Sequence, residues 1–96
     1  MYSIGMPNPN EYTPGIKERF QELAQVGDDP ALAVRGVYRF YFERKPTATT
    51  LDKQFLLGNS FLFALHSGLP RAEEKVIFDE EAQRYRDQQQ RAKPKA

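Results

Sequence analysis

Residues 49–66 read TTLDKQFLLGNSFLFALH, and this stretch decides the fold class. Thr49, with Asp52 three residues later, has the form of a capping box at a helix start, with Asp in place of the usual Glu. Gly68, just beyond the stretch, is a typical helix stop. The apolar residues between these signals recur at helical spacing and cover one broad face: Leu51, Phe55, Leu57, Phe61, Leu62 and Leu65. We therefore predict a central helix over residues 50–66, with Phe61 in the core.

Two helices are predicted before this one. Thr13 can cap a helix whose first position is a proline, which predicts a helix over residues 14–26 that ends at Gly27. Asp29 is likewise followed by proline and predicts a helix over residues 30–45. Residues 37–42, VYRFYF, are also rich in strand formers, so a β-strand there is kept as an alternative.

The two ends of the chain differ in character. A fourth helix is predicted over residues 70–90, with a narrow apolar stripe of Phe78, Ala82 and Tyr85. Residues 84–96 then carry five basic residues and one acidic residue. The first thirteen residues are rich in Pro and Asn and show no periodicity. We predict a small all-α, four-helix domain over 14–87, between an irregular N-terminal arm at 1–13 and a flexible basic tail at 88–96.

The composition excludes several classes of protein. The chain has 96 residues, a net charge of +1, one histidine and no cysteine. Disulfides, thiolate metal sites and cysteine nucleophiles are therefore excluded, and the balanced charge is not that of a wholly basic nucleic-acid-binding surface. The most apolar stretch, residues 55–65, is far shorter than the roughly 20 residues needed to cross a bilayer. With no leader-like start, we expect a cytoplasmic protein without a membrane partner.

No residue pattern predicts catalysis. Asp52, Asn59 and His66 share one helical face, but neighbours lie about 10.5 Å apart along the axis, too far to form a triad. His66 is interpreted as a residue that caps its helix end. The acidic residues of the fourth predicted helix are interpreted as a solvated face: Glu73, Glu74, Asp79, Glu80 and Glu81. We therefore predict no catalytic, cofactor-binding or metal-binding residue.

The second predicted helix carries the candidate binding surface. Its aromatic and aliphatic residues occupy more than half of its circumference, which is more than its neighbours are expected to cover. Two arginines at i and i+4 border this surface, and Arg and Tyr are enriched in interface hot spots. The predicted partner-binding residues are Arg35, Tyr38, Arg39, Phe40, Tyr41 and Phe42, together with Val76 and Ile77 of the fourth helix. Arg39→Glu is expected to weaken binding and leave thermal stability nearly intact.

These observations favour a non-enzymatic protein–protein interaction module, such as a small accessory subunit or adaptor of a larger complex, including a non-catalytic subunit of an enzyme. Self-association into a homo-oligomer is a further expectation. The alternative is a helix-turn-helix nucleic-acid-binding protein, because residues 64–68 run from Ala to Gly with the spacing of that motif. The basic tail is expected to be a frayed helix end and a solvated chain segment. A role as a basic arm for an acidic partner or a nucleic-acid backbone stays open as the alternative.

Overall fold

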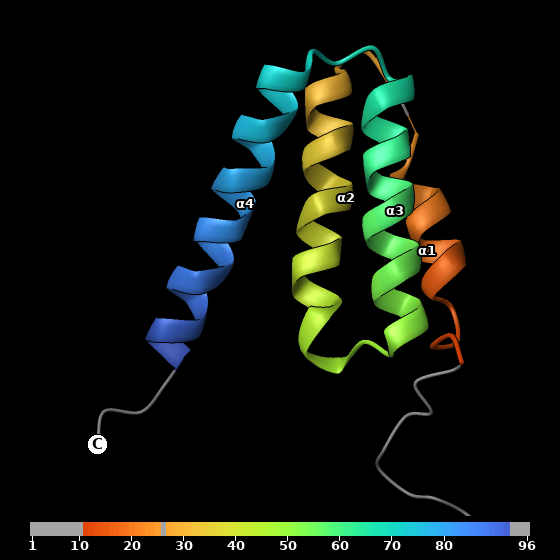
Figure 1. Cartoon of the computed structure of the whole chain (residues 1–96), viewed down its shortest axis with the longest axis vertical. Coiled ribbons are helices and arrows are strands. Elements are labelled where there is room, and N and C mark those ends of the chain that lie inside the picture. Colours follow the sequence, from red (N-terminus) through yellow and green to blue (C-terminus); the bar gives the residue numbers. More distant parts are fainter. Residues whose placement is uncertain (1–10, 26, 93–96) are drawn as a thin grey trace, which may run out of the picture.

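Four α-helices build the part of the chain that the computed structural model describes, residues 11–25 and 27–92 (Figure 1). They are α1 (Ile16–Leu23), α2 (Pro30–Arg44), α3 (Thr50–His66) and α4 (Arg71–Ala92), with a short 3-10 helix η1 (Lys45–Thr47) after α2. The predicted all-α, four-helix class is confirmed. The strand alternative for residues 37–42 is wrong, because these residues lie within α2.

The starts of α2 and α3 follow from local signals. The Asp29 side chain accepts a hydrogen bond from the backbone N–H of Ala31 at 3.0 Å. In the capping box of α3, the Asp52 N–H donates to Thr49 Oγ1 and the Thr49 N–H donates to Asp52 Oδ2, both at 3.0 Å. Gly68 follows α3 with φ of +83°, the left-handed conformation that ends many helices. Both predicted helices therefore have nearly the predicted bounds.

Helix α1 is shorter than predicted. It begins at Ile16, after Gly15 in a left-handed conformation with φ of +84°, and ends at Leu23 rather than at Gly27. Thr13 does not cap it. Instead, the Thr13 N–H donates to Asp52 Oδ1 at 2.9 Å and the Thr13 hydroxyl donates to Oδ2. Burial raises the pKa of Asp52, but the hydrogen bonds from Thr13 and Thr49 outweigh it and hold that pKa below its usual value. The carboxylate thus ties the segment before α1 to the start of α3.

Helix α2 is central, and the prediction that α3 is central is wrong. α2 packs against α1, α3 and α4, and Figure 1 shows it between α4 and α3. The shortest principal dimension of the molecule is 18 Å, about the thickness of two layers of helices. The wide apolar arc of α2 suits the middle position, because neighbours on several sides cover it. α3 packs against α2 and, through the Phe20–Phe55 ring contact, against α1, but these neighbours leave one of its apolar faces exposed.

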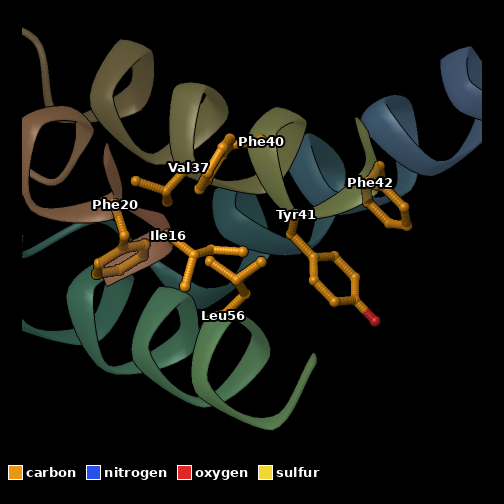
Figure 2. Packing of buried hydrophobic residues seen from close by; sticks show 7 residues of the cluster. All are labelled: Ile16, Phe20, Val37, Phe40, Tyr41, Phe42 and Leu56. Atoms are coloured by element: carbon orange, nitrogen blue, oxygen red, sulfur yellow. The ribbon is translucent and has the colours of Figure 1, made fainter. Parts of the chain in front are cut away.

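The core forms around α2 in two groups of side chains. Figure 2 shows the larger group, in which residues of α1, α2 and α3 meet: Ile16, Phe20, Val37, Phe40, Tyr41, Phe42 and Leu56. The smaller group joins α2 to α3 and α4 through Val34, Tyr38, Ala64 and Ile77. In α3 the buried residues are Asp52, Leu56, Ser60 and Ala64. The broad apolar face predicted for the core is thus turned mostly outward, and Phe61 is 39% exposed.

Helix α4 continues past the predicted domain boundary at residue 87. It runs to Ala92, so the first part of the predicted flexible tail is helical. Within residues 86–91, Gln88 is partly buried and the others are exposed. The predictions for residues 1–10 and 93–96 lie outside the described residues.

Candidate functional site

The four aromatic residues predicted to bind a partner belong to the core. Tyr38, Phe40, Tyr41 and Phe42 are between 3% and 8% exposed. Tyr38 and Phe78 meet edge to face with ring centroids 5.1 Å apart, and Phe42 packs against Phe78 at 5.3 Å. The expectation that these rings exceed what the other helices can cover is wrong, because α1, α3 and α4 all pack on α2. These rings therefore offer little surface to a partner.

The two arginines of α2 bind acidic residues of α4. Arg35 donates to Glu81 at 2.8 Å and to Glu80 at 2.6 Å, and Arg39 donates to both oxygens of Glu81 at 2.9 and 3.1 Å. Glu81 is 3% exposed. Burial raises the pKa of Glu81, but the hydrogen bonds from Arg39 and Arg35 outweigh it and hold that pKa below its ordinary value. This network fastens α4 to α2.

Arg39→Glu is therefore expected to lower the melting temperature by about 5–15 °C, because it removes two charged hydrogen bonds and places a second carboxylate beside Glu81. Thermal unfolding followed by circular dichroism measures this. Arg86→Glu is the control, since Arg86 is exposed and bonds to Gln83, and it should change little. An unchanged melting temperature for Arg39→Glu would contradict the pairing. The sequence-based expectation that Arg39→Glu leaves thermal stability nearly intact treated Arg39 as an exposed, unpaired charge. Its two hydrogen bonds to Glu81 contradict that assumption.

The remaining predicted residues lie on two sides of α4. Val76 is 53% exposed, whereas Ile77 is buried against α2. The prediction of a fully solvated acidic face is wrong at two positions, because Glu74 and Glu81 are buried on the same side of the helix as Ile77. Arg35, Arg39 and Val76 keep exposed surface, and docking at these three positions stays a prediction.

The most continuous exposed apolar surface among the described residues lies on α3. We call it the α3 face, and it consists of Leu57, Phe61, Leu62 and Leu65, each between 39% and 48% exposed. Their spacing places all four within about 140° of the helix circumference. Between Lys53 and His66 the sequence contains no charged residue. The apolar residues of α3 are visible in the sequence, but the sequence analysis placed them in the core and predicted the uncovered apolar surface on α2 instead.

A groove runs between the α3 face and α4, with a volume of about 570 Å³. Leu57 and Phe61 of α3 line one side, α4 lines the other with residues between Arg71 and Asp79, and Tyr38 of α2 also lines it. The Tyr38 hydroxyl donates to Glu74 Oε2 at 2.7 Å. Burial, with the bond to Glu74, raises the pKa of Tyr38 far above its ordinary value, so this hydroxyl remains a donor. The groove thus combines apolar walls with a buried carboxylate.

The arrangement of α3 and α4 does not resemble a helix-turn-helix unit. Residues 67–70 connect the two helices, which matches the length of that turn. The helices, however, lie on either side of α2 and each packs against it (Figure 1). The geometry therefore gives the nucleic-acid alternative no support.

The described residues contain no cluster of three or more potential metal-ligating side chains. His66 is exposed in the last turn of α3. Asn59 donates its side-chain amide to the Phe55 carbonyl at 2.8 Å, and Asp52 serves the capping box. No described helix combines the length and apolar character that a membrane span requires. The chain matches no protein-family model, and comparisons with curated proteins and with solved structures find no match either.

Proposed function

We propose that this chain is a non-enzymatic protein–protein interaction module that docks a helical segment of a partner protein on the α3 face and the adjoining groove. The α3 face is the observation that carries the proposal: four large apolar side chains, each at least 39% exposed, on a charge-free stretch of helix. Contiguous apolar surface of this kind in a small domain is typical of a binding site. An accessory subunit or adaptor of a larger complex fits this surface.

A helical partner suits the shape of the site. The exposed residues follow i, i+4, i+5 and i+8 along α3, so they form a ridge parallel to the helix axis. The groove beside this ridge is open along α4 and bordered by both helices. An amphipathic helix that lies in such a groove buries its own apolar residues at i, i+3, i+4 and i+7 against the ridge.

Leu62→Glu is expected to weaken partner binding at least about tenfold, because docking would bury the new carboxylate against apolar surface. Leu32→Glu is the matched control, since Leu32 is 66% exposed on α2, away from the α3 face. Wild type and both variants serve as bait in parallel, each bound protein is quantified, and its affinity is remeasured with purified components. Circular dichroism checks that all three fold alike.

The expected result is a partner that binds wild type and Leu32→Glu with equal affinity and is lost with Leu62→Glu. Equal binding of every partner to Leu62→Glu would refute the α3 face as the docking site. Sedimentation of the same samples tests the homo-oligomer expectation. A wild-type dimer that Leu62→Glu converts to a monomer would show that a second copy of the chain, rather than another protein, covers the face.

A further inference from the structure

Glu74 is a buried carboxylate with incomplete hydrogen bonding. The residue is 6% exposed and lines the groove between α3 and α4. Its Oε2 atom accepts the Tyr38 hydroxyl, whereas its Oε1 atom is buried without a hydrogen-bond partner. The nearest cation is Arg71, whose Nε atom lies 3.6 Å from Oε1, beyond hydrogen-bond length. A buried carboxylate in this state is costly unless a donor reaches its free oxygen.

The groove around Glu74 is lined by aromatic rings. Tyr38, Phe61 and Phe78 all contribute to it. The Arg71 guanidinium lies 4.9 Å from the centre of the Phe61 ring, so that ring already holds a planar cation within cation–π distance. The Arg71 side chain is largely exposed and can leave the ring for solvent. Aromatic faces beside a carboxylate form the combination that recognises organic cations.

The other charges of the groove are already paired. Lys75 donates to Asp79 at 2.9 Å, and both side chains are exposed at its rim. Glu74 is therefore the lining carboxylate whose cation, Arg71, stays beyond hydrogen-bond length at 3.6 Å. Its Oε1 atom is buried without a hydrogen-bond partner, and the residue lines a groove of about 570 Å³, enough for a long side chain. An arginine brings several N–H donors in one plane and suits both the carboxylate and the rings.

We propose that the groove is a guanidinium-binding site, in which an arginine side chain of the docking partner bonds to Glu74 Oε1 and takes the place of Arg71 against Phe61. This rests on the proposed function, because it names the side chain that the docked helix inserts beside the α3 face. It assigns two roles to the surface. Apolar contacts on α3 bury surface when the partner docks, and the Glu74 carboxylate selects partners with a correctly placed arginine.

The test uses the isolated protein and two small probes of the same shape. n-Butylguanidinium carries the charge, and n-butylurea is its neutral counterpart. Each is titrated at millimolar concentration, and amide chemical shifts around Tyr38, Phe61 and Glu74 are followed by nuclear magnetic resonance. We expect the shifts to saturate, and to give an affinity for the guanidinium at least tenfold higher than for the urea. A hydrogen bond to a charged group contributes enough binding free energy for this difference.

Two variants assign the contact to its residues. Glu74→Gln keeps the shape and an acceptor for Tyr38, and should weaken guanidinium binding at least tenfold. Arg71→Ala removes the internal competitor and should strengthen binding about two- to fivefold, the equivalent of one exposed cation–π contact. Both variants are checked for wild-type circular dichroism, and the comparison of the two probes on wild type needs no variant.

Equal affinity for the two probes, wild-type affinity in Glu74→Gln, or no gain in Arg71→Ala would each overturn the guanidinium site. These results leave the α3 face untouched, because Leu62 does not line the groove. Loss of partner binding in Leu62→Glu together with equal binding of the two probes would keep the interaction module and reject the arginine. The two proposals therefore fail separately.

Discussion

Leu56→Ala is expected to destabilise the protein by about 2–5 kcal/mol, whereas Phe61→Ala should cost about 1 kcal/mol or less. Leu56 is fully buried where α1, α2 and α3 meet (Figure 2), and its removal leaves a cavity that packed neighbours cannot fill. Phe61 is 39% exposed and has solvent on one side. A loss at the upper end of the range would consume much of the 5–15 kcal/mol typical of a folded domain.

Urea denaturation followed by circular dichroism gives both free energies of unfolding. The pair is informative because the substitution with the larger volume change, at phenylalanine, is expected to have the smaller effect. A larger cost at Phe61 than at Leu56 would contradict the outward orientation of the α3 face. It would also favour the sequence-based prediction that placed Phe61 in the core.

Glu81→Ala is expected to cost about 2–4 kcal/mol near neutral pH. Loss of one partner of a buried ion pair typically costs 3–5 kcal/mol, and the value is reduced here because the Arg35 and Arg39 side chains are 33% and 40% exposed and can regain water. Glu80→Ala is the matched control. Glu80 also binds Arg35, but its side chain is 55% exposed, so its loss should cost at most about 1 kcal/mol.

The cost of Glu81→Ala should depend on pH. The pKa of Glu81 is lower in the folded protein than in the unfolded chain, so the folded state favours the carboxylate. The contribution of Glu81 to the free energy of unfolding is fully present above its pKa in the unfolded chain, about 4.3. This contribution is lost as the pH falls through its pKa in the folded protein. Denaturation of wild type and Glu81→Ala from pH 7 to pH 3 should show the difference shrinking below about pH 4. A constant difference would contradict the ion-pair assignment.

Local signals in the sequence predicted the helices better than their arrangement. Asp29 and Thr49 act within three residues of their own position, so α2 and α3 begin where predicted. Thr13 is not the cap of α1, because Asp52, 39 residues away, holds its N–H and its hydroxyl, and Gly15 takes the N-cap position. A contact between residues so far apart in the sequence depends on how α1 and α3 pack, and no local sequence pattern predicts that packing.

The choice of the central helix illustrates the same limit. Both α2 and α3 carry apolar residues around much of their circumference, and the pattern of α3 alone does not say which side meets α2. One available signal was missed. Arg35 and Arg39 are one turn apart, and Glu74 and Glu81 lie on the same side of α4 as Ile77. Complementary charges beside apolar residues on two helices could have indicated the α2–α4 contact, and with it the burial of two glutamates.

Because α4 is longer than the part of it that packs on the domain, the loss of helical content on heating should not coincide fully with unfolding of the domain. The last residues of α4, beyond Gln88, extend past the packed part of the fold and are exposed at positions 89–91. A helical end without tertiary contacts is held by propagation from the preceding turns, and nucleation is too unfavourable for so short a segment to form alone. It therefore frays at temperatures where the core is intact. Ellipticity should decline gradually before the main transition, and this early loss reports the free end of α4 rather than unfolding of the domain.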